Sequence, residues 1–510
     1  MTARIVFTLM FTASAALAQR GAFQMVEEDG RPVASYYGVE PHLHAALNQM
    51  SGYFAPRKGQ AFRVWEDNMM PLDLKDLNFE PGQRLMRRWF AEFFKDQVAE
   101  TGLIPLGGLS RPSERLYTIL DQSKCFFLGT MSRATPFLDW FPNDAEVHER
   151  CLKMAEGFLK YCRAGRASSF GLFPAVRADT GFPESDLVNV TSYGSAIAGL
   201  TRIGTAAKRQ DLLDAAKGIA TWVSNFSTRY CAGIVPEKFH AVGGCPTDLS
   251  SDGIYWIRAL GKAYETTGDG FYRDLILRHG NVYYEHGWQP DYQHFITTVV
   301  VDGEGIHPTG NMRGDTKYNY PHLLCLLTRL THNPKYMERF DALWATYLRE
   351  ACDGWMPNTL DQGHRTQKKS EPPEDKNQSI YLQLLLEAHE ATNDPKYLAQ
   401  AGAWAEKLLT PEGEAHWRGD SVGTDLIRYA RRAKLVSRLE VRFTTPARTA
   451  LQVVKPDGSP VFSEQVDTPI AVLYLAPGRY VVRAAGCVEK SVELLSEEKE
   501  SVALGVGFHP

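Results

Sequence analysis

The sequence predicts a mainly α-helical protein: an (α/α)6 toroid of helical hairpins followed by a small C-terminal β-sandwich. Three observations lead to this prediction. A unit of polar loop, apolar helix, turn and amphipathic helix recurs about every 60–65 residues along residues 81–436. The apolar helices number six, which is enough to close a ring. The hydrophobic pattern then changes to a period of two after Arg438, as in β-strands.

The clearest repeat unit is His307–Ala351. Its polar loop is rich in reactive groups and leads into the apolar run Pro321–Leu330, which we expect to be a buried inner helix. A His-Asn-Pro turn follows. The next helix places its large apolar residues at spacings of four, three and four, which is one helical face: Tyr336, Phe340, Leu343 and Tyr347.

The following unit repeats this pattern with a constant offset. The four face positions recur 61 residues later (397−336, 401−340, 404−343, 408−347), as Tyr397, Ala401, Trp404 and Leu408. The turns also match, because Asn333-Pro334 corresponds to Asp394-Pro395 and proline suits the first turn of a helix. Inner helices are apolar nearly all round, whereas outer helices carry a polar face. This asymmetry predicts a double-layered ring.

Six inner helices are predicted, at Leu116–Thr130, Val190–Ile203, Ile254–Thr266, Pro321–Leu330, Ser379–Ala391 and Val422–Ala433. The sixth has no outer partner after it in the chain, because strands begin near Leu439. The amphipathic segment Leu85–Val98 is free to supply that partner and close the circle. We therefore expect a closed toroid over residues 81–436 rather than an open solenoid.

Residues 437–510 are predicted to form the β-sandwich. Asp457-Gly458 is typical of a hairpin turn. The segment Leu475–Val482 resembles the turn and strand of prealbumin-like accessory domains on secreted proteins. The expected short strands are Leu439–Phe443, Leu451–Val454, Ala471–Leu475 and Tyr480–Ala484.

The N-terminus predicts export. Arg4 precedes the apolar stretch Ile5–Ala15, and Ala16-Leu17-Ala18 has the small-x-small pattern of a signal-peptidase site. We expect residues 1–18 to be a cleaved signal peptide and residues 19–80 to be an extension packed on the toroid. The mature protein is then secreted or periplasmic. No later stretch approaches the ~18 apolar residues of a membrane span.

The charge balance argues against nucleic acid as the partner, because 56 basic residues oppose 60 acidic ones without a long basic run. Aromatic residues make up 11% of the chain, a level compatible with surfaces on which sugars stack. The oligomeric state is left open by the sequence.

A chain of six helical hairpins, with polar loops leading into the inner helices, resembles the six-hairpin glycosidase superfamily and its (α/α)-toroid relatives. These include glycoside hydrolases and uronate polysaccharide lyases. The resemblance covers roughly residues 80–435 and rests on the repeat and its turns. It implies a poly- or oligosaccharide substrate in a cleft at the mouth of the ring, lined by the loops before the inner helices. No particular family's catalytic motif is found, so no catalytic residue is transferred by position.

The leading hypothesis is a glycoside hydrolase, which needs two carboxyl groups across the scissile bond. We single out Asp248, Asp252 and Asp315 as catalytic candidates, because each precedes or begins an inner helix. An aspartate in such a position is also a common helix N-cap. Other carboxylates in these loops are Glu184, Asp186, Asp302, Glu304, Asp375 and Asp420.

A lyase is the runner-up. Abstraction of the proton α to a uronate carboxylate needs a Tyr or His base and cationic or amide groups that stabilise the enolate-like state. The loop before the fourth inner helix and the start of that helix supply such groups: His307, Asn311, Arg313, Tyr318, Tyr320 and His322. A purely structural interpretation stands beside this one, in which Tyr318 and Tyr320 are core aromatic residues and His322 is a hydrogen-bonded residue of the helix.

The remaining substrate-binding candidates are His240, Tyr255, Trp256 and Glu304. Asp302-Gly303-Glu304 has oxygen ligands suited to Ca²⁺ but is equally a surface turn, so no metal or other cofactor is assigned. The third hypothesis is a non-catalytic glycan-binding protein, in which the β-sandwich docks the ring to a surface.

Overall fold

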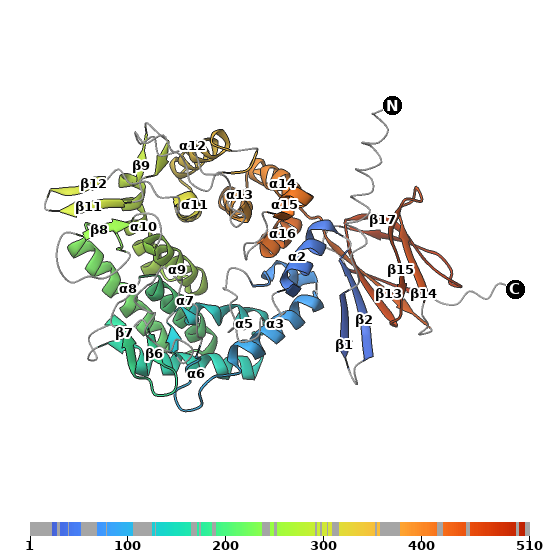
Figure 1. The fold of residues 1–510 in the computed structure, drawn as a ribbon, viewed down its shortest axis with the longest axis horizontal. Helices are drawn as coiled ribbons and strands as arrows, with labels where there is room; N and C mark the ends of the chain where they lie inside the picture. Colours follow the sequence, from blue (N-terminus) through green and yellow to red (C-terminus); the bar gives the residue numbers. More distant parts are fainter. Residues whose placement is uncertain are drawn as a thin grey trace.

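A computed structural model gives the fold (Figure 1). It describes residues 23–27, 31–38, 40–52, 69–77, 79–105, 125–127, 129–164, 171–172, 175–185, 190–236, 245–248, 252–290, 293–295, 298–302, 304–308, 316–351, 354–356, 378–415, 422–444, 449–495 and 499–504.

The inner layer of the ring consists of helices that follow one another around a central axis (Figure 1). Each packs against the next in chain order, so neighbours in space are consecutive units of the repeat. The inner helices are α4 (Thr130–Arg133) with α5 (Thr135–Trp140), α7 (Val190–Ala207), α9 (Asp252–Thr267), α11 (Thr316–Thr331), α13 (Gln378–Thr392) and α16 (Val422–Arg432).

The outer layer covers them. Outer helices follow their inner partners after short turns, at α6 (Ala145–Tyr161), α8 (Gln210–Tyr230), α10 (Gly270–His286), α12 (Lys335–Arg349) and α14 (Pro395–Leu408). The predicted (α/α)6 toroid is therefore confirmed.

The predicted face residues of the outer helices are the ones that are buried. Tyr336 and Tyr397, the first of each set of four, are both only 2% exposed, and the other members of both sets are also buried. Asp394 begins α14 as an N-cap, since its Oδ1 accepts a hydrogen bond from the Lys396 backbone N–H at 2.9 Å. The spacing of apolar residues thus determined which face of each outer helix packs inward.

The ring closes differently from the prediction. Helix α3 (Glu80–Phe94), which corresponds to Leu85–Val98, packs against α5. The helix that packs along α16 is instead α2 (Pro41–Gly52), from the N-terminal extension. Our assignment of Leu85–Val98 as the partner of the sixth inner helix was therefore wrong, because α2 already covers α16.

A short segment, Met69–Leu72, joins the last inner helix to the first, and we call it the closing strap. The Met70 carbonyl accepts a hydrogen bond from Trp140 Nε1 at 2.8 Å, and the Met69 carbonyl accepts one from Thr424 Oγ1 at 3.2 Å. Trp140 belongs to α5 and Thr424 to α16. The 3₁₀ helix η2 (Leu72–Leu77) continues the strap and packs between the same two helices.

The first predicted inner helix, Leu116–Thr130, lies mostly outside the described residues. Its described part contradicts the prediction, because Cys125–Phe127 form strand β3. This strand pairs with β6 (Ala175–Arg177), which in turn pairs with β7 (Pro183–Ser185). The helical part of this unit begins only at Thr130. Tertiary pairing with a distant strand decides the conformation of this short apolar run.

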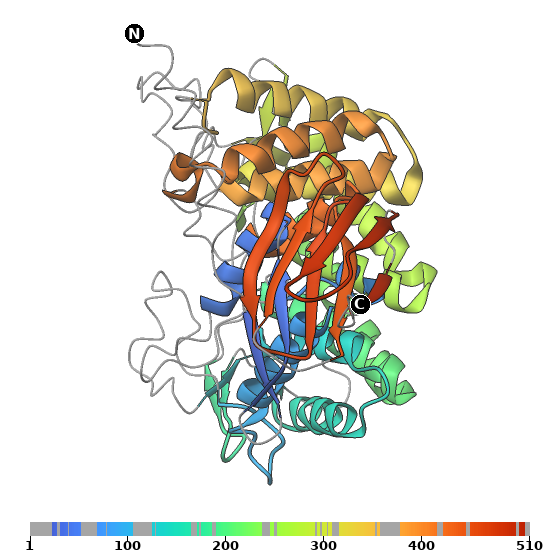
Figure 2. The same cartoon turned by 90° about the vertical axis from the view of Figure 1, so that its right-hand side faces the viewer.

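The C-terminal domain is a sandwich of two sheets (Figure 2). One has the order β15-β14-β17-β18, from Pro460–Val466, Thr449–Val454, Gly478–Ala484 and Lys490–Leu494. The other has the order β1-β2-β16-β13-β19, from Phe23–Glu27, Arg31–Gly38, Ile470–Leu475, Ser437–Phe443 and Lys499–Leu504. The N-terminal extension thus contributes two strands to the sandwich as well as α2 to the ring.

The sandwich docks on the ring through β13 and β16. Arg438 on β13 lies between two carboxylates, 3.0 Å from Glu80 of α3 and 2.8 Å from Glu440 of its own strand. The ring of Tyr474 on β16 packs edge-on against Phe79, with the ring centres 4.9 Å apart. In the part of the chain that is described, no helix has the length and apolar character needed to cross a membrane.

Candidate functional site

The loops before the third and fourth inner helices are joined in space. Strand β8 (Cys245–Asp248) pairs with β11 (Thr298–Asp302), and β11 pairs with β12 (Gly305–Pro308). Asp248 stands opposite Thr298 in this sheet. These loops therefore lie together at the N-terminal ends of α9 and α11.

Two of the three predicted catalytic carboxylates, Asp248 and Asp252, belong to described elements at this end. Asp248 ends β8 and Asp252 begins α9, and for both the structure describes only the backbone. Asp315 lies outside the described residues, as do His240 and Arg313. Tyr318 belongs to α11, but the structure does not describe its side chain.

Of three other predicted binding residues, two are buried in the core and one is exposed. Trp256 is completely buried, and its ring packs edge-on against His279 with the ring centres 5.3 Å apart. Tyr320 is also completely buried, and its hydroxyl donates a hydrogen bond to the Tyr283 carbonyl. Glu304 is exposed in the β11–β12 turn. The two aromatic residues thus serve the core in this structure.

The predicted calcium ligands Asp302 and Glu304 lie at the turn between β11 and β12. Asp302 Oδ1 accepts a hydrogen bond from the Glu304 backbone N–H at 2.8 Å and lies 3.2 Å from Nε2 of His307. The backbone hydrogen bond, aided by His307, lowers the pKa of Asp302 below its ordinary value. Within the described ranges, no group of three or more His, Cys, Asp or Glu side chains is placed to hold a metal ion.

A cavity of about 350 Å³ lies at the centre of the ring. One of its walls is mainly apolar and comes from the closing strap with Pro136 and Trp140 of α5; Asp139 of the same helix, which pairs with Arg202, also lines it. The facing side is charged. Its lining residues come from the inner helices α9, α11, α13 and α16: Arg258, Lys262, Glu265, His322, Arg329, Gln383, Glu387, Glu390 and Arg428.

Exposure along these helices shows where the cavity opens. On α9, the exposed side-chain fraction rises from 18% at Arg258 to 56% at Glu265. On α11, it rises from 3% at His322 to 36% at Arg329. Both increases run toward the C-terminal helix ends. The described lining is therefore most exposed at the C-terminal helix ends, and the cavity reaches solvent there, at the end of the ring opposite the loops that carry Asp248 and Asp252.

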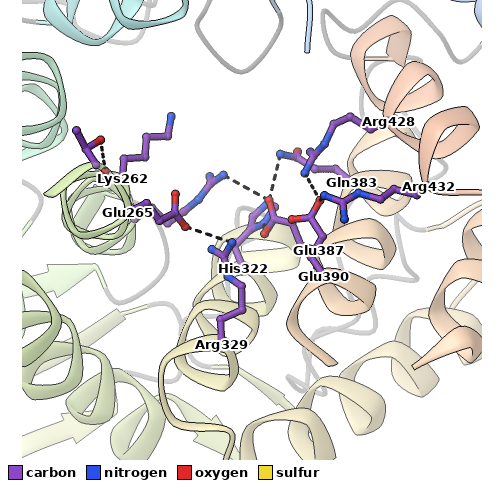
Figure 3. A network of polar contacts seen from close by, with 11 residues as sticks. Lys262, Glu265, His322, Arg329, Gln383, Glu387, Glu390, Arg428 and Arg432 are labelled. Carbon is purple, nitrogen blue, oxygen red and sulfur yellow. Dashed lines mark hydrogen bonds and ion pairs between the residues drawn. The ribbon is translucent and has the colours of Figure 1, made fainter. Parts of the chain in front are cut away.

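Glu387 is the centre of the charged side (Figure 3). Its Oε2 accepts a hydrogen bond from Nδ1 of His322, and its Oε1 lies 3.8 Å from a guanidinium nitrogen of Arg258. One carboxylate on α13 thus joins α9 and α11. Burial by itself raises the pKa of Glu387, but His322, Arg258 and Arg428 outweigh burial and lower it to about 2. Glu387 is therefore ionised at neutral pH.

Ion pairs between neighbouring helices surround this centre. Arg428 of α16 lies 2.9 Å from Glu390, one helical turn after Glu387. Nearer the opening, Arg329 of α11 lies 3.3 Å from Glu265 of α9. Figure 3 shows these side chains pointing toward one another from four inner helices. The polar side is thus an organised network rather than a set of isolated charges.

Among the predicted site residues whose side chains the structure describes, His322 is the one that lines the cavity. Tyr255 is near it, since the Arg258 guanidinium carbon lies 5.8 Å from the centre of the Tyr255 ring. The prediction missed Glu387, Glu390 and Arg258. The sequence holds a signal for the two glutamates: Gln383, Glu387 and Glu390 form a polar stripe at spacings of four and three on an inner helix whose middle is largely apolar.

No protein-family model and no curated protein sequence matches the chain. Among solved structures, it is similar to cellobiose 2-epimerase from Bacillus thermoamylovorans B4167, with 12% identity, a TM-score of 0.49, and coverage of 70% of this chain and 99% of that one. It is also similar to a D-mannose isomerase, with 12% identity, a TM-score of 0.44, and coverage of 78% and 98%. It is similar as well to a family 76 glycoside hydrolase from a bovine Bacteroides thetaiotaomicron strain, with 11% identity, a TM-score of 0.41, and coverage of 81% of this chain and 83% of that one. Likenesses of this size assign neither reaction nor substrate.

Proposed function

We propose that this protein is a carbohydrate-active enzyme that transfers a proton at a sugar carbon next to a carbonyl or carboxylate group. The observation that carries the proposal is the hydrogen bond between His322 and the ionised Glu387 on the wall of the central cavity. Such chemistry includes β-elimination, the runner-up among our hypotheses, and also epimerisation or isomerisation, because all three begin with abstraction of an acidic C–H proton.

Each residue has a defined role in this proposal. In the neutral form of His322, Nδ1 donates its proton to a hydrogen bond with Glu387, and Nε2 is the atom that takes the proton from the sugar carbon. The negative charge of Glu387 then stabilises the imidazolium that forms. Arg258 and Arg428 also line the cavity, and their guanidinium groups stabilise the enolate oxygen that develops on the substrate.

The leading hypothesis from the sequence, a glycoside hydrolase, remains the second candidate. A glycosidase needs one carboxyl group that stays protonated to act as the acid. Glu387 does not suit that role, because its pKa is lowered to about 2. The candidates remain Asp248, Asp252 and Asp315, and the observation in favour of them is the sheet that joins the loops before α9 and α11. Glycan binding without catalysis is the third candidate.

Activity assays on the wild type and on site variants distinguish the three candidate functions. The purified protein is incubated with a panel of reducing sugars, oligosaccharides and uronate glycans in D₂O. Deuterium incorporation at sugar carbon is followed by NMR, unsaturated products by absorbance near 235 nm, and hydrolysis by new reducing ends. We expect deuterium incorporation or elimination that His322→Ala and Glu387→Gln reduce by about 100-fold or more, and that Asp248→Asn and Asp252→Asn reduce much less.

Other outcomes contradict this proposal. Hydrolysis that Asp248→Asn or Asp252→Asn abolishes, and that His322→Ala leaves intact, supports the glycosidase. Binding of a glycan with none of the three readouts supports the glycan-binding protein.

Export remains part of the proposal and rests on the apolar stretch Ile5–Ala15 and the Ala16-Leu17-Ala18 pattern. Expression of the full chain in a bacterial host, fractionation, and mass spectrometry of the N-terminus test it. We expect a mature protein that begins at Gln19 in the periplasm or medium. Retention of residues 1–18 on a cytoplasmic product contradicts it.

A further inference from the structure

We infer that the cavity binds one sugar ring in its pyranose form, or the end of a short chain, and that the ligand enters at the C-terminal ends of the inner helices. The inference deepens the proposed function, and it rests on that function only for the claim that the bound sugar is turned over. The binding claim stands on the shape and lining of the cavity.

The mainly apolar wall and the charged wall of the cavity face each other across the ring. The inner helices follow one another in the order α5, α7, α9, α11, α13 and α16, and the closing strap lies between α16 and α5. The strap is therefore opposite α9 and α11. Its apolar residues face the side that carries Arg258 and His322.

This arrangement suits a ring-shaped polyol. A pyranose has a flat patch of C–H groups on one face, which packs on an apolar wall, and hydroxyl groups around its edge, which need hydrogen-bond partners. Arg258, Gln383 and Glu390 supply donors and acceptors on the charged side. An open-chain polyol has similar hydroxyl groups but no fixed apolar face. The cavity is thus expected to prefer the ring for binding. A uronate keeps its carboxylate in that form, whereas a bound reducing sugar has to open to its carbonyl form before its C–H proton is abstracted.

The volume limits the ligand to a small one. At about 350 Å³, the cavity is near the lower end of the ~300–1,000 Å³ range of small-molecule sites. A polysaccharide laid through the ring would need a longer groove. We therefore expect action on free sugars or chain ends rather than on the interior of a polymer.

We place the entrance of the cavity at Leu72. It belongs to the strap, lines the cavity, and has 43% of its surface exposed. Glu265 and Arg329 also line the cavity, from the opposite helices, and their side chains are 56% and 36% exposed. A larger side chain at Leu72 has room to remain on the surface without disturbing the core, and it would narrow the entrance.

Calorimetry on the full chain tests the inference. The probes are the methyl glycosides of glucose, mannose, galactose and glucuronic acid, with sorbitol as the open-chain control. Leu72→Trp is compared with Leu348→Trp, because Leu348 is equally an exposed leucine but lies on the outer helix α12. We expect at least one glycoside to bind, about tenfold more tightly than sorbitol, and Leu72→Trp to weaken it about tenfold. Leu348→Trp should change Kd less than twofold.

Two results overturn the inference: no methyl glycoside binds, or Leu72→Trp and Leu348→Trp bind equally well. His322→Ala separates this inference from the proposed function. If that variant still turns over sugar while Leu72→Trp weakens binding, the proposed function fails and the binding site stands. If His322→Ala abolishes turnover and Leu72→Trp leaves binding unchanged, the access route fails and the proposed function stands.

Discussion

His322 and Glu387 are 65 residues apart in the chain and form a hydrogen bond at the centre of the ring. His322 is on α11 and Glu387 on α13, so the bond joins two neighbouring inner helices. Both side chains are largely buried, with exposed fractions of 3% and 15%. The pair therefore holds the scaffold together as well as carrying the proposed chemistry, and its variants should report on both.

The first prediction concerns acid stability. The pKa of Glu387 is about 2 in the folded protein, against an ordinary value of 4.5, so its contribution to stability is complete above pH 4.5 and is lost as pH falls toward 2. We expect Glu387→Gln to lower the free energy of unfolding by about 3 kcal/mol at pH 7 and to flatten its decline between pH 4.5 and 2. Urea unfolding at pH 7, 4 and 3 measures both effects.

Glu265→Gln is the matched control. Glu265 pairs with Arg329 at 3.3 Å near the cavity mouth, where its side chain is 56% exposed, so its loss should cost less than about 1 kcal/mol. Equal costs for Glu387→Gln and Glu265→Gln at pH 7 would contradict the central role of Glu387.

The second prediction concerns a glycine at the start of α9. A Cβ on Gly253 would lie 1.8 Å from the Tyr283 hydroxyl and 2.5 Å from the Val235 carbonyl oxygen. We therefore expect Gly253→Ala to lower stability by about 1–3 kcal/mol. At Gly270, the first residue of α10, the nearest atom to such a Cβ is 3.7 Å away at the end of Arg273. Gly270→Ala should leave stability unchanged or raise it by up to about 1 kcal/mol.

Thermal unfolding of the two variants beside the wild type measures the difference. The same loss of stability in both would mean that the close packing around Gly253 is not what requires glycine there.

The third prediction concerns the closing strap. Thr424→Val keeps the size of the side chain but removes the hydrogen bond to the Met69 carbonyl, which joins α16 to the strap. We expect a loss of about 1–2 kcal/mol. In the control, Thr266→Val removes a hydrogen bond of 2.8 Å to the Lys262 carbonyl within α9 itself, and its effect should stay within about 0.5 kcal/mol. Chemical unfolding of both variants is the test, and a reversed order of effects would refute it.

The fourth prediction concerns the junction between ring and sandwich. Arg438→Met leaves Glu80 and Glu440, whose side chains are 30% and 11% exposed, without the guanidinium between them. We expect a loss of about 3 kcal/mol and two unfolding transitions in the variant against one in the wild type, because the domains lose an ionic link. Scanning calorimetry detects the number of unfolding transitions.

Arg479→Met is the control, since its partner Glu493 is on the surface of the sandwich. A single transition in Arg438→Met would show that apolar packing at Tyr474 is enough to couple the domains.

The fold was largely predictable because its information is local. Apolar residues at helical spacing identify the outer helices, and the match between Tyr336 and Tyr397 identifies the repeat. The Asp457-Gly458 turn was predictable for the same reason: Gly458 adopts a positive φ of 84° between β14 and β15. Such features depend on neighbours within a few residues in the chain, so the sequence displays them directly.

The site was much less predictable. Among the candidates, His322 is at the cavity, whereas Trp256 and Tyr320 are in the core. A single sequence does not separate these cases, because a histidine or an aromatic residue on an inner helix suits either place. Exposure depends on which face of the helix meets its two neighbours in the ring.

The sequence by itself determined the ring of hairpins and the sandwich, since hydrophobic periodicity and turn residues act over short distances in the chain. Only the tertiary structure decided that α2 rather than α3 packs along α16, that two N-terminal strands complete the sandwich, and that Glu387 meets His322. These contacts join residues separated by tens to hundreds of positions. Their energies depend on packing and on the electrostatics of a shared interior, which no local pattern in the chain records.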